Sequence, residues 1–148
     1  MTKLLIINSL IRKINLKFLK NNVMVVEGIE RQITLRGNTY HCALDVTMNF
    51  IGGKWKTVVL WYLKNDKKRF GELKKRIPDI TEKMLSLQLK SLEEDGIVKR
   101  TIYPEVPPRV EYELTDFGKT LIPMLNEIAK WGKELAVKEG VLVDKETK

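Results

Sequence analysis

The sequence predicts a mainly helical α+β fold with one small β-hairpin, and three observations lead to this prediction. Within residues 81–94, Leu85, Leu89 and Leu92 recur at the spacing of one buried helix face. Two runs that alternate between apolar and polar residues follow, on either side of a proline-rich tip at 104–108. A long apolar stripe at helical spacing comes after the hairpin, so we expect helices to outnumber strands.

Size and composition indicate one soluble domain with an anionic partner. The chain has 148 residues, enough to bury a core, and a formal net charge of +8. That charge favours nucleic acid or an anionic membrane as the partner. No run of about 18 apolar residues occurs, so no transmembrane helix is expected. One cysteine and one histidine predict neither an intramolecular disulfide nor a metal site. We expect a cytoplasmic protein without a cofactor.

The segment 1–26 differs from the rest, because it carries five basic residues and no acidic one. Its apolar residues form one helical stripe, which consists of Leu4, Ile7, Ile11, Ile14 and Phe18. Three interpretations fit this basic amphipathic extension. It could be a helix that packs on a partner subunit or a helix that lies on a membrane surface. It could also be absent from the native protein, since Met24 offers a second translation start. We therefore argue function from the domain at 27–148.

The first part of that domain predicts three short helices. A helix at 44–51 ends at a pair of glycines, which suit a helix end and a tight turn. A second helix follows at 54–63, and a basic turn at 64–68. Gly71 is the expected cap of a third helix at 72–77, which a proline then ends.

The second part predicts a helix, a hairpin and a last helix. Thr81 is expected to cap the helix that ends at Glu94, and Thr115 to cap a helix that continues to about Lys138. The helices between 70 and 94 are joined by a short break, as in a helix-turn-helix. A helix with a mixed polar face, followed at once by a basic hairpin, is typical of a winged helix that binds DNA, here with a long C-terminal dimerisation helix.

Six sequence blocks carry a family resemblance that runs from about Tyr40 to Trp131. They are Ile51-Gly52-Gly53-Lys54-Trp55, Arg69-Phe70-Gly71-Glu72-Leu73, Ile77-Pro78-Asp79-Ile80-Thr81-Glu82-Lys83-Met84-Leu85, Leu92-Glu93-Glu94-Asp95-Gly96, Val106-Pro107-Pro108-Arg109-Val110-Glu111-Tyr112 and Leu114-Thr115-x-x-Gly118. In this order and spacing the chain resembles the HxlR-type winged helix-turn-helix family of bacterial and archaeal transcription regulators, which are relatives of the MarR type.

The resemblance implies a homodimer that binds operator DNA and regulates nearby genes. Some members of the family sense oxidants or electrophiles through a cysteine just before the first domain helix, and Cys42 stands at that place. Members usually have Cys-Pro there, whereas Ala43 follows Cys42 in this chain. A buried, unreactive Cys42 is the alternative.

The residues expected to contact DNA fall into two groups, because base edges give specificity and phosphates give affinity. The residues predicted to read bases lie on the outward face of the helix at 81–94; they are Lys83, Ser86, Leu87, Gln88 and Lys90. The residues predicted to contact phosphates or to act from the wing are Lys54, Trp55, Lys56, Lys68, Arg69, Lys74, Thr81, Arg100 and Arg109. Glu111 and Glu113 could instead hold Arg100 or Arg109 in ion pairs.

The last helix has more apolar surface than one small domain covers, which predicts a dimer interface. The predicted interface residues are Phe117, Leu121, Leu125, Ile128 and Trp131. The alternative function is a winged helix that binds another protein and no DNA. An enzyme is not expected, since the chain has no phosphate loop, metal cluster, catalytic triad or nucleotide fingerprint. The sequence identifies no effector.

Overall fold

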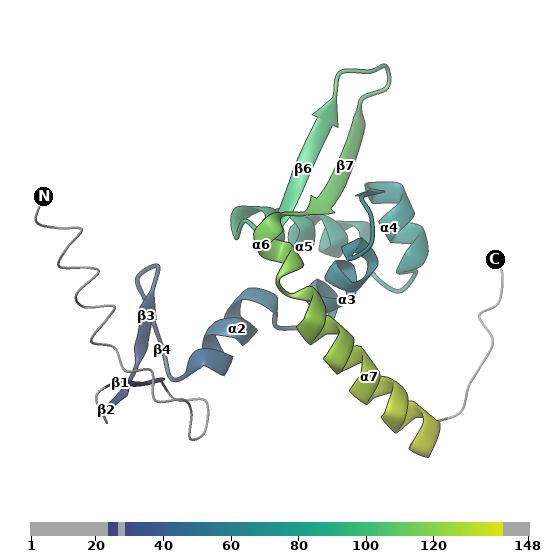
Figure 1. The fold of residues 1–148 in the computed structure, drawn as a ribbon. Helices are drawn as coiled ribbons and strands as arrows, with labels where there is room; N and C mark the ends of the chain where they lie inside the picture. The colour runs from purple at the N-terminus through teal and green to yellow at the C-terminus, as the bar shows by residue number, and fades with distance from the viewer. Residues whose placement is uncertain (1–23, 27–28, 141–148) are drawn as a thin grey trace, which may run out of the picture. The chain divides into compact units, whose positions relative to one another are not determined.

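The computed structural model describes residues 24–26 and 29–140, which belong to two compact units (Figure 1). The first unit ends at Gly52 and the second begins at Gly53. Most of the predicted extension 1–26 lies outside the described residues.

The described part of the first unit contains four short strands and one helix. The strands form two antiparallel pairs: β1 (Met24–Val26) with β2 (Ile29–Arg31), and β3 (Ile33–Leu35) with β4 (Asn38–Tyr40). Arg36 and Gly37 both have positive φ, at 50° and 78°, as a two-residue type I′ turn between β3 and β4 requires. Helix α2 (Ala43–Ile51) follows and confirms the predicted helix to within one residue. The sequence analysis predicts none of these four strands.

The second unit is a helical domain with a three-stranded antiparallel sheet. Its helices are α3 (Lys54–Leu63), α4 (Phe70–Arg76), α5 (Glu82–Glu94), α6 (Asp116–Lys119) and α7 (Ile122–Glu139). Its strands, in sheet order, are β5 (Lys68–Arg69), β7 (Arg109–Leu114) and β6 (Val98–Tyr103). Strands β6 and β7 form the predicted hairpin, which extends from the helices as a wing (Figure 1). The predicted α+β winged-helix fold is confirmed.

Leucines from several helices build the core of this domain. Leu85, Leu89 and Leu92 of α5 are at most 1% exposed, so the predicted buried face of that helix is confirmed. On α3 the buried residues are Val59, Leu60 and Leu63, whereas Trp55 and Tyr62 are half-buried. The apolar residues of α3 surround most of the helix, so periodicity alone did not identify its most buried side.

One predicted helix start and the predicted end of the basic turn were wrong. Helix α4 begins at Phe70, and not after Gly71, because the Arg69 backbone N–H donates to the Glu72 carboxylate at 2.6 Å and fixes the first turn. The basic turn at 64–68 is also shorter than expected, since β5 begins at Lys68 and pairs with β7.

The predicted long last helix is two helices. Thr115 does cap a helix, since its hydroxyl accepts from the Gly118 N–H at 2.9 Å, but that helix, α6, ends at Lys119. The Thr120 and Leu121 N–H groups then bond to carbonyls only three residues back. Pro123 lies in the first turn of α7, where its missing N–H is tolerated, whereas in the interior of a continuous helix its ring would clash with a carbonyl.

Candidate nucleic-acid interface

Helix α5 separates a buried leucine face from an exposed mixed face. Its start is fixed by Thr81, whose hydroxyl accepts from the Met84 N–H at 3.1 Å, as the sequence predicted. Leu87 is 51% exposed, and Ser86 is exposed beside it. Four of the five residues predicted to read bases are exposed on this face: Lys83, Ser86, Leu87 and Lys90. Such a face offers donors, a hydroxyl and one apolar contact to a partner.

Gln88 and Lys90 make local contacts on the same helix. Gln88 is half-buried, and its Nε2 lies 3.1 Å from the Met84 sulfur. Lys90 Nζ lies 3.8 Å from the Glu94 carboxylate, with both side chains largely exposed. An exposed pair of this kind contributes less than about 1 kcal/mol, so it leaves Lys90 available to another anion.

Some of the residues predicted to contact phosphates are exposed, and others have ion-pair or hydrogen-bond partners within the domain. Lys54, Arg69, Thr81 and Arg100 are exposed. Trp55 is half-buried, and the Lys54 ammonium lies 4.4 Å from the centre of its ring. The start of α3 and the exposed strand β6 therefore present cations to the surroundings.

Three other predicted cations have partners within the domain. Lys56 lies 3.8 Å from the Asp95 carboxylate, and the Lys56 side chain is 14% exposed. Lys68 forms an ion pair with Asp66. Lys74 donates to the Pro78 carbonyl at 3.0 Å. Only the Lys56–Asp95 pair joins separate elements and so depends on tertiary packing, whereas the partners of Lys68 and Lys74 lie within four residues in the sequence.

Arg109 is held at the wing by its neighbours. Its guanidinium lies 2.9 Å from Glu105, 3.2 Å from Glu111 and 4.0 Å from the centre of the Tyr103 ring. The predicted ion pair between Arg109 and Glu111 is thus present. Glu113 instead lies 3.7 Å from Lys99. Arg109 therefore does not extend from the wing as a free cation.

Glu111 also links the wing to the loop before β5. It is 8% exposed, and the Lys67 ammonium lies 2.7 Å from its carboxylate. Hydrogen bonding from Lys67 holds the pKa of Glu111 below its ordinary value, and the same interaction raises the pKa of Lys67. Both groups are therefore charged at neutral pH.

The wing has two exposed apolar residues that the sequence analysis did not select. Val106 at its tip is fully exposed, and Ile102 on β6 is 55% exposed. The signal in the sequence was an apolar residue within a proline-rich tip. An exposed apolar tip suits contact with a partner surface.

The residues predicted for the dimer interface are only partly exposed. Phe117, Ile128 and Trp131 are 60%, 50% and 66% exposed, and Leu121 is half-buried. Leu125 is 3% exposed and packs within the domain, so it offers little surface to a partner. Phe117 belongs to α6 and does not continue the stripe of α7.

Cys42 is the residue immediately before α2. It is half-buried, and its carbonyl accepts from the Val46 N–H at 3.2 Å. The Asp45 carboxylate in the first turn accepts from the His41 N–H at 2.9 Å, and no side chain caps the first amides of α2. The thiol is thus next to a helix start but takes no part in capping it.

Two further findings concern only the described residues. No group of three or more His, Cys, Asp and Glu side chains among them is arranged to hold a metal ion. None of the helices within them is both long and apolar enough to cross a membrane.

Helices α4 and α5 and the wing that follows them define this protein as a winged helix-turn-helix protein. The model of a family described as HxlR-like helix-turn-helix matches residues 50–139, and the chain belongs to that family. It is therefore a transcriptional regulator of the helix-turn-helix type and not an enzyme.

Known relatives agree with this assignment. An uncharacterized HTH-type transcriptional regulator of Methanothermobacter thermautotrophicus is 53% identical over 94 residues, which are 64% of this chain and 72% of the relative. The solved structure of the redox regulator HypR in its oxidized form is similar with a TM-score of 0.61 at 47% identity, over 63% of this chain and 96% of HypR. Diamide-treated YodB from B. subtilis is similar with a TM-score of 0.54 at 34% identity, over 63% of this chain and 93% of YodB.

Proposed function

We propose that this regulator binds operator DNA as a homodimer, with α5 in the major groove and the wing against the flanking backbone. The observation that supports this most strongly is the division of α5 into a buried leucine face and an exposed face with Lys83, Ser86 and Leu87. A helix anchored on one side and polar on the other can enter a major groove without losing its packing.

Each exposed residue of α5 has a chemical role in this proposal. Lys83 donates to guanine acceptors, Ser86 exchanges hydrogen bonds with either type of base, and Leu87 contacts a thymine methyl group. Lys90 exchanges its ion pair with Glu94 for a contact with the DNA, and Gln88 lies at the edge of the exposed face of α5.

Phosphate contacts come from the exposed cations of separate elements. Lys54 at the start of α3 and Arg69 before α4 lie on helix starts, and Arg100 lies on the wing. A contact of Arg109 with a narrow minor groove requires the guanidinium to leave Glu105 at 2.9 Å and Glu111 at 3.2 Å.

The homodimer is proposed from α7. Ile128 and Trp131 leave apolar surface uncovered within one copy of the domain, and Leu135, 41% exposed, extends this surface along the same helix. Two recognition helices read two half-sites about one DNA turn apart, or a multiple of it, which gives a specificity that one helix lacks.

The test is binding of the purified protein to the DNA upstream of its own gene, against a scrambled duplex, across a salt series. We expect selective binding that weakens steeply with salt, because neutralised phosphates release counterions. Lys83→Ala should lower the preference for the operator, whereas Lys130→Ala on α7 should not. Weak binding that is equal on both duplexes would favour the alternative, a winged helix that binds a protein.

We infer in addition that Cys42 makes this binding sensitive to oxidants. The support is its place before α2 and the similarity to HypR and YodB, whose structures are described by redox state or diamide treatment. The chain has one cysteine, so two Cys42 thiols from two subunits would lose two electrons and two protons to diamide and form a disulfide.

A non-reducing gel and an operator-binding assay test this inference together. Diamide should produce a covalent dimer and change operator binding of the wild type, and Cys42→Ser should bind DNA but show neither effect. Equal responses of both proteins would refute a sensing role for Cys42.

A further inference from the structure

A basic hollow beside α4 is not explained by the DNA-binding face. We propose that this hollow, the α4 groove, binds a small organic phosphate with a planar ring. The groove consists of two hollows of about 330 and 500 Å³ that share Asp66, Lys68 and Arg76. Volumes of this size suit a small molecule.

The charge of the groove favours an anion. Its lining contains five cationic side chains and two carboxylates. Both carboxylates are engaged, since Asp66 forms an ion pair with Lys68 and Glu72 accepts from the Arg69 N–H. Lys67 is paired with Glu111, outside the groove, so the excess positive charge comes from Lys64, Lys75 and Arg76. The site therefore keeps an excess of positive charge in a recess, where an anion is less screened than on an open surface.

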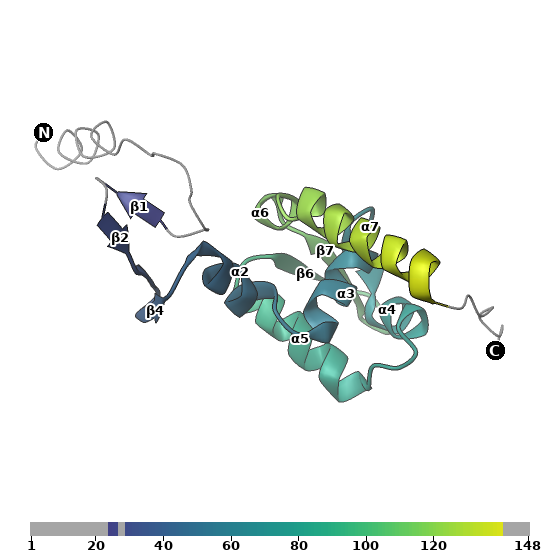
Figure 2. The same cartoon turned by 90° about the horizontal axis from the view of Figure 1, so that it is seen from below.

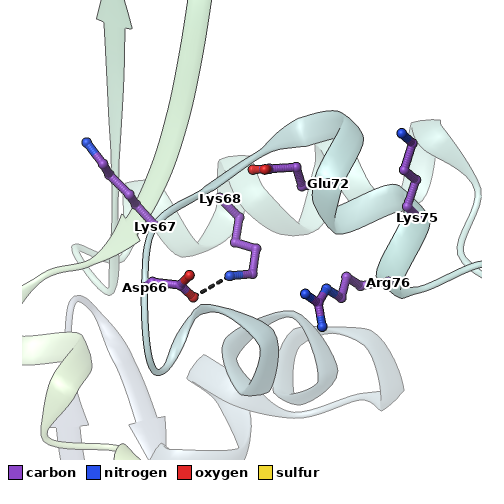
Figure 3. Close-up of a pocket in the computed structure, with 6 residues that line it drawn as sticks. All are labelled: Asp66, Lys67, Lys68, Glu72, Lys75 and Arg76. Atoms are coloured by element: carbon purple, nitrogen blue, oxygen red, sulfur yellow. Dashed lines mark hydrogen bonds and ion pairs between the residues drawn. The ribbon is translucent and has the colours of Figure 1, made fainter.

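Arg76 and Lys68 are placed to hold the phosphate group. Figure 3 shows the Arg76 guanidinium and the Lys68 ammonium pointing into the same space between α4 and the loop before β5, whereas Lys75 extends in another direction. Within the described residues the Arg76 side chain has no hydrogen-bond or ion-pair partner. A guanidinium offers two parallel donors to phosphate oxygens, and a lysine adds a point charge.

The recessed position of Lys68 distinguishes this site from a contact with duplex DNA. Its side chain is only 12% exposed, although it is charged. A duplex presents its phosphates to protruding side chains, whereas a small anion can enter the hollow. We therefore assign the groove to a small molecule.

Aromatic side chains suit the ring of the ligand. Trp61 and Tyr62 line the larger hollow and are half-buried. The Lys64 ammonium lies 3.3 Å from the centre of the Trp61 ring and donates to the Asn126 amide oxygen at 3.1 Å, which fixes this wall against α7. A planar ring gains stacking on such a surface.

The groove is connected to the wing through β5. Lys68 pairs with Tyr112 and Arg69 pairs with Glu111 of β7, and Lys67 holds the same Glu111 carboxylate. An anion that draws Lys68 away from Asp66 acts on the strand that supports the wing. We expect the occupied groove to change operator affinity; this consequence alone rests on the proposed function.

Binding is tested without DNA by titrating the full chain with phenyl phosphate and following tryptophan fluorescence and calorimetric heat. Inorganic phosphate and phenol are the comparison probes, because one has the charge without the ring and the other the ring without the charge. We expect phenyl phosphate to bind at least about fivefold more tightly than either.

Three variants make the test specific. Arg76→Gln should weaken phenyl phosphate binding about tenfold or more, since a charge-assisted pair of hydrogen bonds is lost. Asp66→Asn should tighten it, because the acid that competes for Lys68 is removed. Lys130→Gln, which changes a cation on α7, should bind like the wild type.

Each outcome decides the proposal. A tighter Asp66→Asn and a weaker Arg76→Gln, both with wild-type circular dichroism, would support it. No saturable binding of phenyl phosphate, or equal loss in Lys130→Gln, would overturn it. If Arg76→Gln instead weakened operator binding while phenyl phosphate failed to bind, the groove would belong to the DNA interface.

Discussion

The orientation of α5 can be tested by two leucines on opposite faces of the same helix. Leu89 is 1% exposed, so Leu89→Ala removes buried methyl groups from the core. The lost transfer free energy is about 2 kcal/mol, and the cavity that remains raises the expected loss of stability to about 3–5 kcal/mol. For a domain of this size the melting temperature should fall by at least about 10 °C.

Leu87→Ala is the matched substitution on the exposed face. Leu87 is 51% exposed, and we expect its removal to change the free energy of unfolding by less than about 0.5 kcal/mol. It should nevertheless weaken operator binding, because a contact with the DNA is lost. Urea unfolding and operator binding would be measured for both variants. Equal destabilisation by the two substitutions, or wild-type operator binding by Leu87→Ala, would refute the proposed orientation of α5.

Three further predictions concern packing, charge and assembly. Gly118→Ala would drive a methyl group into a backbone carbonyl and should cost about 2 kcal/mol in urea unfolding, whereas Gly132→Ala, whose methyl meets nothing within 4 Å, should be neutral or stabilising. Because Lys67 lowers the pKa of Glu111, the wild type should be more stable than Glu111→Gln at neutral pH. This difference in stability should disappear as the pH falls through the lowered pKa of Glu111. A difference that persists at lower pH would contradict the ion pair. Trp131→Glu should shift the protein from dimer to monomer in sedimentation experiments, and an unchanged dimer would exclude α7 from the interface.

Local chemistry made much of the fold predictable. The three leucines of α5 repeat at the helical period, and Thr81 supplies the cap, so that helix and its buried face followed from neighbouring residues alone. The hairpin followed from alternation on either side of a proline-rich tip. The break between α6 and α7 also has a local cause, since Pro123 favours the first turn of a helix over its interior.

The family, the winged-helix fold and the buried face of α5 follow from the sequence alone, because they depend on periodicity and on motifs within short segments. The ion pairs of Lys56 with Asp95 and of Lys67 with Glu111 depend on tertiary packing, since each joins residues that are far apart in the sequence. Tertiary packing also decided that Leu125 is buried. The α4 groove could likewise not be predicted from the sequence, because its lining residues come together only when separate elements pack.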